Sequence, residues 1–440
     1  MTSTPAINKY LSRYAEPECQ QLDGFPAAFL QGLVIPIYRE DVAVVDRFRE
    51  FAGTYPRTLL IVVINQPEND LYKVWYQAIF DKLSLEAPVT NNPQPVSIYW
   101  RSESKQLTLY SVANESSLLV IDRCTAGRRI PEKQGVGLAR KIGNDVLCTL
   151  IHKKQVLSPW MSNTDADVEL PPGYFEATQS APDSTAALIY PFQHTFVDHT
   201  PHLPTLLYEF SLHYYVAGLN WAGSANAYHT IGSLISVNYR HYCQVRGFPK
   251  RSAAEDFYLL NKLVKTGKVI SLKKPIIDIH ARESNRVPFG TGPAVIKINA
   301  QDDPYAMRIY HPDSFVYLYY FLKLLAALAE QPSTIQDCCT ALAIEPQHGI
   351  DRQLLLTFSS AVQLDQVVRH ANEHGNNSTT RLKHLNGWFD GFKTLKLIHF
   401  CRDKELGTIS FRDWSDKYQE SYAFFVTDEM EKTLNKIVLL

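Results

Sequence analysis

TLLIVVIN, residues 58–65, is a continuous apolar run that is typical of a central strand of a parallel sheet, buried on both faces. GLVIPIYRE, residues 32–40, precedes it as a second apolar run that ends at a proline, and apolar residues at helical spacing follow. SSLLVIDR, residues 116–123, is a third run of this kind. Strands separated by helices predict an α/β fold with a largely parallel sheet.

The pattern changes in the last third of the chain. Apolar residues recur at helical spacing in residues 315–329, 352–371 and 381–400, and no comparable apolar strand lies between them. We therefore expect a mainly helical appendage after the α/β domain.

The chain of 440 residues is too long for a single core, because single cores stop growing at roughly 250–300 residues. One large domain with additions is the expected organisation. The predicted regions are an N-terminal extension (1–28), an α/β domain (29–300) and a mainly helical C-terminal region (301–440).

The composition is that of a globular protein, with 45% hydrophobic and 20% charged residues. Lys and Arg number 44 against 45 Asp and Glu, so no overall field favours nucleic acid or an anionic membrane. Any anionic ligand must be bound by local groups, and nucleic acid is not an expected partner.

The seven cysteines are an odd number without CxxC spacing, which favours reduced thiols and a cytoplasmic location. The N-terminus has no apolar core of the signal-peptide type. The longest apolar stretch, residues 315–329, contains Lys323 and is too short for a transmembrane helix, so only peripheral membrane contact is expected.

Asp165 and Asp167 are separated by one residue and follow a short candidate strand that contains Trp160 and Met161. Two carboxylates at a strand end can direct oxygen ligands to one hard divalent cation, which in turn neutralises a diphosphate. A solvated acidic loop is the alternative interpretation of the same tripeptide.

The segment 32–40 resembles the opening strand of family 2 glycosyltransferases, which usually ends in Pro-x-Tyr-Asn-Glu. Pro36, Tyr38 and Glu40 match this motif, and Arg39 replaces the usual Asn. In that family the following loop lines the nucleotide pocket, so the resemblance implies that the three matching residues bind the nucleotide sugar.

GLARKIGND, residues 137–145, resembles the family's Ala-Arg-Asn-x-Gly helix, which precedes the Asp-x-Asp loop. Ala139, Arg140 and Gly143 match, and Lys141 stands in the Asn position. The resemblance places Arg140 among the residues that bind the nucleotide sugar.

VRGFPKRSAAEDFYLLNKL resembles the family's Gly-Gly-Phe segment with its downstream Glu-Asp pair. Gly247, Phe248, Glu255 and Asp256 match, whereas Arg246 stands where the first Gly usually is. In inverting members the Asp of this pair is the general base, so the resemblance gives that role to Asp256 and a position near the acceptor to Glu255. Favourable negative charge in the first turn of a helix is the alternative explanation.

Two further polar sites come from the residues around these motifs. Asn65 and Gln66 end the second strand where the family usually has Asp-x-Ser/Thr, and Asn65 is a candidate contact to the base. His229 and Ser233 precede a predicted helix in the region where such enzymes often receive the acceptor, although an ordinary helix start fits these two residues equally well.

IHARESNRVPFGTGPA brings together His280, Arg282 and Arg286 with two glycines. A histidine at a strand end is a candidate third metal ligand, and the two arginines are candidates for the donor phosphates. A flexible surface loop is the alternative for this stretch.

The resemblance covers approximately residues 33–292. It implies a GT-A-type, Rossmann-like fold with a mixed, mainly parallel sheet flanked by helices. It also implies a metal-dependent glycosyltransferase, using Mn²⁺ or Mg²⁺, that moves a sugar from a nucleotide-diphosphate sugar to a hydroxyl acceptor, with inversion if Asp256 is the base.

Two alternatives stay open from the sequence. A retaining enzyme of the mannosylglycerate-synthase type would use His280 at the metal and no base at Asp256. A nucleotidyltransferase, or a catalytically silent protein that binds sugar nucleotides, is the second alternative. The sequence does not identify the sugar, the base, the acceptor, the oligomeric state or the role of the C-terminal region.

Overall fold

The computed structural model of the chain divides into two compact units. Unit 1 comprises Met1–Thr195, His229–Ala281 and Arg286–Pro288, and unit 2 comprises Phe196–Tyr228, Arg282–Asn285 and Phe289–Leu440. This division differs from the predicted boundaries, because the N-terminal segment belongs to unit 1 and residues 196–228 belong to the C-terminal unit. The structure describes residues 4–26, 29–70, 75–84, 98–196, 202–281, 290–331 and 333–439.

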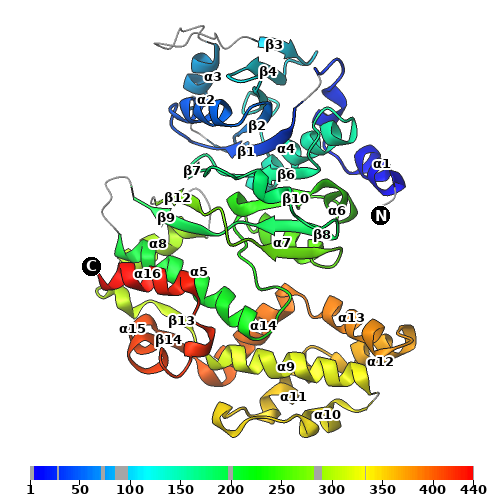
Figure 1. Ribbon diagram of the computed structural model, residues 1–440, viewed down its shortest axis with the longest axis vertical. Helices are drawn as coiled ribbons and strands as arrows, with labels where there is room; N and C mark the ends of the chain where they lie inside the picture. Colours follow the sequence, from blue (N-terminus) through cyan, green and yellow to red (C-terminus); the bar gives the residue numbers. More distant parts are fainter. Residues whose placement is uncertain are drawn as a thin grey trace. The chain divides into compact units, whose positions relative to one another are not determined.

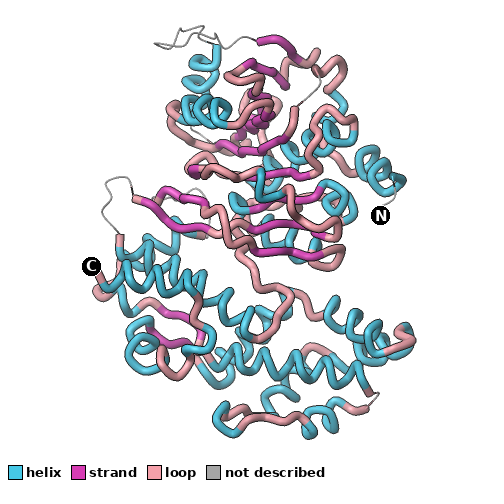
Figure 2. Tube along the Cα trace, in the orientation of Figure 1, coloured by secondary structure: helices cyan, strands magenta, loops and turns pink. Residues whose placement is uncertain are grey.

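Unit 1 contains a mixed sheet with helices packed against it (Figures 1 and 2). The strand order is β11-β8-β10-β6-β1-β2-β5-β4-β3, and the central neighbours β6-β1-β2-β5 are parallel. The predicted α/β fold with a parallel centre is confirmed. The strands are β1 (Gln31–Ile37), β2 (Thr58–Asn65), β3 (Ile98–Arg101), β4 (Leu107–Ser111), β5 (Ser117–Arg123), β6 (Trp160–Asn163), β8 (Thr185–Ile189), β10 (Ile235–Asn238) and β11 (Lys268–Ser271).

Helix α4 (Gly135–His152) packs closely on the central strands. A Cβ atom at Gly143 would lie 2.4 Å from Val34 Cγ1, and one at Gly32 would lie 2.4 Å from Leu147 Cδ1. Only glycine permits this approach of helix and sheet. Because α4 follows β5, its first turns lie near the carboxyl ends of the parallel strands, where ligands bind in open α/β sheets.

The other helices of unit 1 connect or flank these strands. Two of them, α2 and α3, follow β1 and β2 as the sequence predicts. Their bounds, and those of the remaining helices of this unit, are α1 (Thr4–Arg13), α2 (Val44–Thr54), α3 (Trp75–Ser84), α6 (Tyr239–Gln244) and α7 (Glu255–Leu263), with short 3₁₀ turns η1 (Pro17–Gln21), η2 (Glu176–Thr178) and η3 (Gly232–Leu234).

A separate three-stranded sheet of order β7-β12-β9 completes unit 1. Its strands are β7 (Val168–Glu169), β9 (Phe192–Thr195) and β12 (Ile277–His280). From its apolar pattern, AALIYPFQHTF (residues 186–196) is predicted to be one strand, but the structure divides it into two strands, β8 and β9, that belong to different sheets. Pro191 lies between them, and a proline cannot donate a hydrogen bond within a continuous strand.

A buried polar cluster anchors the N-terminal helix α1 in unit 1. The Asp145 carboxylate accepts hydrogen bonds from Lys141 Nζ at 2.7 Å and from Tyr242 Oη at 2.8 Å. Tyr10 Oη of α1 donates to the same carboxylate at 2.5 Å. Lys141, which departs from the family motif, therefore has a structural partner one helical turn away.

Unit 2 is mainly helical, as predicted for the C-terminal region. Its core includes aromatic side chains: the Phe210 ring lies 4.8 Å from Trp414, and Tyr214 lies 5.5 Å from Phe315. This packing explains why α5 joins the helical unit. Its elements are α5 (Leu203–Trp221), α8 (Thr291–Asn299), η4 (Pro304–Ala306), β13 (Arg308–Tyr310), α9 (Asp313–Glu330), α10 (Ile335–Ala341), η5 (Pro346–His348), α11 (Arg352–Ala361), α12 (Leu364–His374), α13 (Ser378–Trp388), α14 (Gly391–Cys401), η6 (Arg402–Leu406), β14 (Thr408–Ser410), α15 (Phe411–Asp413), η7 (Trp414–Tyr418), η8 (Ala423–Phe425) and α16 (Asp428–Val438).

Two of the predicted C-terminal helices are each interrupted. Gln363 has a left-handed φ of 55° between α11 and α12, and the Asp390 side chain caps α14 by accepting from the backbone amide of Lys393. In the described parts of the chain, no helix combines the length and the apolar character that crossing a membrane requires.

Candidate active site

Asp165 and Asp167 lie in the loop between β6 and β7, directly after a strand of the parallel centre. Both side chains are partly exposed, and the side chain of Asp165 is 38% exposed. The predicted Asp-x-Asp loop is thus at the carboxyl edge of the sheet. Both carboxylates are therefore partly accessible to a ligand from solvent.

Arg140 is the buried cation that lies beside this loop. Its Nη2 donates to Asp165 Oδ1 at 2.5 Å, and its Nε donates to Glu255 Oε1 at 2.9 Å, while only 3% of the side chain is exposed. Burial alone would lower the pKa of Arg140, but Asp165, Glu255 and Asp256 together raise it. One guanidinium therefore joins the Asp-x-Asp loop to the Glu-Asp pair, which lies 90 residues further along the chain.

The 3₁₀ turn at Gly232 packs directly against this guanidinium. A Cβ atom at Gly232 would lie 2.4 Å from Arg140 Nη2, so a larger residue would displace the arginine or the turn. Ser233 is buried, with 1% of its surface exposed, and the His229 ring stands edge-on to Phe192 at 5.1 Å. The two predicted acceptor residues thus lie in the same segment as Gly232, which packs against Arg140.

Glu255 and Asp256 occupy the first turn of α7. Ala254, which precedes them, has a left-handed φ of 59°, an uncommon conformation for a residue with a side chain. Asp256 Oδ1 accepts from the backbone amide of Phe257 at 2.7 Å. Burial and the neighbouring Glu255 raise the pKa of Asp256 to about 8, so this carboxyl group binds a proton readily near neutral pH.

His280 ends β12 beside the Asp-x-Asp loop. Its backbone amide donates to the Asp167 carbonyl at 3.2 Å. On the side chain, Nδ1 lies 3.3 Å from Thr195 Oγ1, and Nε2 lies 3.8 Å from Glu169 Oε2. The strand register therefore places the predicted third metal ligand next to the two aspartates.

The donor set of Asp165, Asp167 and His280 suits a divalent cation in kind, since carboxylates and imidazole are its usual ligands. Its side chains are not gathered into a preformed cage. A metal site needs several ligand atoms close together. Among the described residues, three such atoms from His, Cys, Asp or Glu lie within 4.8 Å of one another in α12, not at this site. Arg282 and Arg286, the predicted phosphate contacts, lie outside the described residues.

The segment after β1 is organised by a carboxylate that the sequence did not single out. Asp70 accepts from Tyr38 Oη at 3.1 Å and from Arg39 Nη2 at 2.7 Å. Burial and the Asp70 charge raise the pKa of Tyr38 to about 12. Arg39, which replaces the family's Asn and has a φ of 54°, thus has a defined ionic partner.

The remaining predicted donor-binding residues lie along the same strand ends. Pro36 is in β1 opposite Val63 of β2, and Glu40 is partly buried in the turn that follows β1. Asn65 Nδ2 donates to the Ile37 carbonyl at 2.9 Å. The Asn65 side chain therefore joins β2 to β1 through its amide nitrogen. Its side-chain oxygen, Oδ1, is then the atom that could accept a hydrogen bond from a ligand.

Two buried polar atoms around Asp165 have no hydrogen-bond partner among the described residues. They are Thr164 Oγ1, on the residue before Asp165, and Arg140 Nη1, on the guanidinium that binds Asp165. Buried polar groups are almost always satisfied by protein, water or ligand. Both atoms therefore have hydrogen-bonding capacity that a water molecule or a polar ligand beside Asp165 could satisfy.

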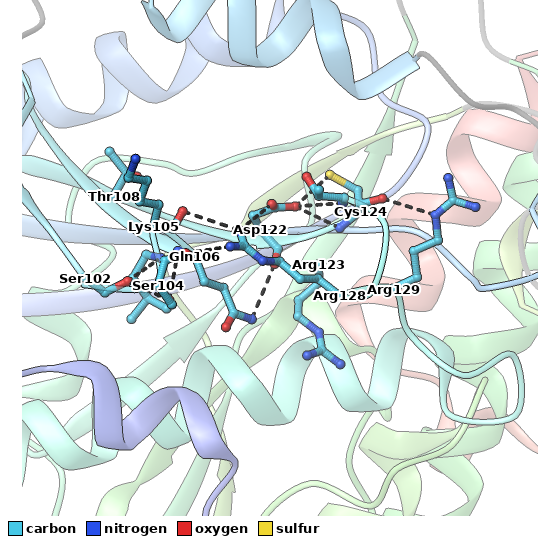
Figure 3. Close-up of polar contacts among 12 residues, drawn as sticks. Ser102, Ser104, Lys105, Gln106, Thr108, Asp122, Arg123, Cys124, Arg128 and Arg129 are labelled. Atoms are coloured by element: carbon cyan, nitrogen blue, oxygen red, sulfur yellow. Dashed lines mark hydrogen bonds and ion pairs between the residues drawn. The ribbon is translucent and has the colours of Figure 1, made fainter.

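A polar pocket of about 280 Å³ lies beside strands β3, β4 and β5 at one end of the large sheet. The Asp122 carboxylate at its border accepts from the amides of Cys124 and Thr125 and pairs with Arg128 at 2.9 Å (Figure 3). Burial raises the pKa of Asp122, but hydrogen bonds from Thr125 and Cys124 outweigh burial and lower it. None of the described residues that the sequence predicted for the catalytic or binding site lines this pocket. Its lining is Gln77, Phe80, Arg101, Lys105, Gln106, Thr108, Tyr110, Val120, Asp122 and Thr125.

Three residues of the main site were missed from the sequence, namely Asp70, Glu169 and Gly232. Glu169 is two residues after Asp167, and the alternation of side chains in extended backbone could have placed both on one side of the chain. Asp70 and Gly232 had no such local signal, because their partners, Arg39 and Arg140, are distant in the chain.

No protein-family model matches the chain, and no curated protein matches it significantly. Among solved structures, the chain is similar to the crystal structure of S. aureus TarS 1–349 in complex with UDP-GlcNAc. This match has 12% identity and a TM-score of 0.34, and it covers 82% of this chain and 90% of that one. A second crystal structure of S. aureus TarS 1–349 has the same identity and coverage and a TM-score of 0.32.

Proposed function

We propose that the chain is a metal-dependent glycosyltransferase of the GT-A type, which transfers a sugar from a nucleotide-diphosphate sugar to a hydroxyl acceptor. One observation carries this proposal: the buried guanidinium of Arg140 binds Asp165 and Glu255 at once. The carboxylates proposed for the donor side and the acceptor side of the reaction therefore share one cation.

On the donor side, Asp165, Asp167 and His280 are the residues proposed to hold Mn²⁺ or Mg²⁺. When bound, the cation supplies charge neutralisation for the diphosphate leaving group. The unpartnered Thr164 Oγ1 and Arg140 Nη1 support the same location, because both can donate hydrogen bonds to ligand oxygens.

On the acceptor side, Asp256 is the proposed general base. It would take the proton from the acceptor hydroxyl as that oxygen bonds to the anomeric carbon and the bond to the diphosphate oxygen breaks. A base is most effective when its pKa lies near the working pH, and the pKa of Asp256, raised to about 8, meets this condition. Direct displacement by this route inverts the anomeric carbon.

Arg140 is proposed as a positioning residue between these two sides. Its hydrogen bond to Glu255 holds the first turn of α7, and its hydrogen bond to Asp165 holds the loop after β6. The close packing of Gly232 leaves the guanidinium little room to turn away. One buried side chain thereby links the loop that is proposed to hold the metal to the helix turn that carries the proposed base.

The experiment is a titration of the purified chain with a panel of nucleotide-diphosphate sugars, with and without manganese, followed by an assay for nucleotide-diphosphate release. We expect at least one donor to bind only with the metal. Asp256→Asn should keep this binding and lose turnover, whereas the surface variant Asp183→Asn should keep both.

Three results would change the proposal. Absence of metal-dependent binding across the panel would reject the donor site, and binding without any release would favour a silent sugar-nucleotide-binding protein. A product with retained anomeric configuration would remove the base role from Asp256 and favour the retaining mechanism.

The proposed location is the cytoplasm. All seven cysteines are free thiols, which fits a reducing compartment.

A further inference from the structure

A cluster of metal-ligating side chains lies in unit 2, on helix α12. His370, Glu373 and His374 are all exposed. Glu373 follows His370 by three positions, and His374 follows His370 by four. Residues three and four apart lie on the same face of a helix, so the three side chains extend from one side of α12.

The ligand atoms of these three side chains lie within 4.8 Å of one another. A tetrahedral zinc ion with bonds of about 2.0–2.1 Å holds its ligand atoms roughly 3.3 Å apart, so small side-chain rotations close the site. The His370 and His374 rings are already near each other, with centroids 4.2 Å apart. The ring of His384 on the neighbouring helix α13 stands edge-on to His370 at 5.9 Å.

One hydrogen bond already orients the His374 ring. Its Nδ1 lies 3.0 Å from the carbonyl oxygen of His370, which is an acceptor only, so Nδ1 carries the proton. The Nε2 atom then presents its lone pair outward. Metal-binding histidines commonly donate their second ring N–H to a carbonyl in this way, which fixes the tautomer and the ring orientation.

The Glu373 carboxylate supplies the negative charge of the cluster. Among the described residues, no salt bridge joins it to a lysine or an arginine, so no protein cation competes for it. Two imidazoles and one carboxylate on one helix face form a set that zinc and its neighbours in the transition series prefer. Magnesium prefers a set composed of oxygen ligands alone.

We propose that His370, Glu373 and His374 form a surface site for a borderline divalent cation of the zinc type. This site is independent of the proposed cation at Asp165 and Asp167, because the two sets share no residue and their helices and loops belong to different units.

The test is calorimetric titration of the full chain with ZnCl₂, in a background of Asp165→Asn and Asp167→Asn that removes the proposed catalytic cation site. We expect one zinc ion per chain to bind through this cluster. His370→Ala combined with His374→Ala should weaken that binding by at least about tenfold, since it leaves one ligand of three. The matched control, His152→Ala, removes a histidine at the end of α4 and should leave binding unchanged.

Thermal unfolding supplies a second measurement. An ion that binds only the folded state raises the midpoint, so zinc should stabilise the background protein and not the double-histidine variant. Magnesium at the same concentration should produce no difference between them. Equal zinc affinity and stoichiometry with and without the two histidines would overturn the site, as would absence of zinc binding by the background protein. Glu373→Gln, which keeps both imidazoles, should show an intermediate loss even if the double variant folds poorly.

Discussion

Replacement of Arg140 by methionine is the most direct test of the shared guanidinium. Methionine resembles the aliphatic stem of arginine but carries no charge and no hydrogen-bond donor. The substitution therefore leaves Glu255, which is 5% exposed, without its cation. Asp165 is affected less, because its 38% exposed side chain regains water.

The expected loss follows from these exposures. Breaking a buried ion pair by removing one partner costs about 3–5 kcal/mol, because the remaining charge stays buried. The exposed Asp165 adds little, since surface pairs contribute about 0–1 kcal/mol. We therefore expect Arg140→Met to lower the free energy of unfolding of unit 1 by about 3–5 kcal/mol and Arg140→Met with Glu255→Gln to recover part of this loss.

Amide hydrogen exchange in α4 measures this quantity without requiring the two units to unfold together. The matched control is Lys141→Met, which breaks the neighbouring buried pair with Asp145 at 2.7 Å. Both variants should destabilise unit 1, but only Arg140→Met should also weaken metal-dependent donor binding. A loss below about 1 kcal/mol for Arg140→Met, or an equal effect of both variants on donor binding, would refute the proposed bridge.

Four further predictions concern the same site. Asp256→Asn should lower turnover by about a hundredfold or more with donor affinity near wild type in calorimetry, because general-base catalysis contributes roughly 10²–10⁴-fold. Burial raises the pKa of Asp256 to about 8 in the folded metal-free protein, whereas the same group in the unfolded chain releases its proton at about pH 4. The free energy of unfolding should therefore decrease as the pH rises from about 4 to about 8. Urea titrations of Asp256→Asn should lack this pH-dependent contribution. Gly232→Ala should lower stability by about 1–3 kcal/mol in denaturant titrations, since its Cβ would lie 2.4 Å from Arg140 Nη2, and an unchanged midpoint would contradict this packing. Asp167→Asn should abolish the manganese dependence of donor binding while the thermal midpoint changes little.

The sheet and the order of the motifs were predictable because both depend on local sequence. The apolar runs at 32–40, 58–65 and 116–123 each form a strand of the parallel centre. The ends of these strands can then be located in the sequence, and residues at the carboxyl ends of parallel strands share one edge of the sheet. The position of Asp165 could therefore be anticipated, although its contacts could not. His280 ends β12 of the separate three-stranded sheet, so this argument does not apply to it.

The division into units was not predictable in the same way. Helix α5 comes between strands of unit 1 in the sequence, so its assignment depends on which aromatic partners its side chains find. Phe210 packs on Trp414, which is 204 residues away, and helical spacing alone does not identify such a partner. The breaks at Gln363 and Asp390 were likewise hidden within long apolar patterns.

Two of the departures from the family motifs have a common physical explanation. Arg39 and Lys141 each replace an Asn, and each binds a carboxylate, Asp70 and Asp145 respectively. The Lys141 partner lies at i+4 on a predicted helix and could have been inferred from spacing. The Arg39 partner lies beyond β2, so only the folded sheet reveals it.

The balance of charge around Arg140 connects these observations to the proposed chemistry. Asp165, Glu255 and Asp256 all act on one guanidinium, so three carboxyl groups share one positive charge. Burial and the neighbouring Glu255 raise the pKa of Asp256 to about 8, so a proton on Asp256 reduces this excess of negative charge at neutral pH. A divalent cation at Asp165 and Asp167 would supply positive charge to the same group of carboxylates and thereby favour the ionised form of Asp256 that a base requires. The sequence displays the acidic residues one by one, whereas their competition for a single arginine exists only in the fold.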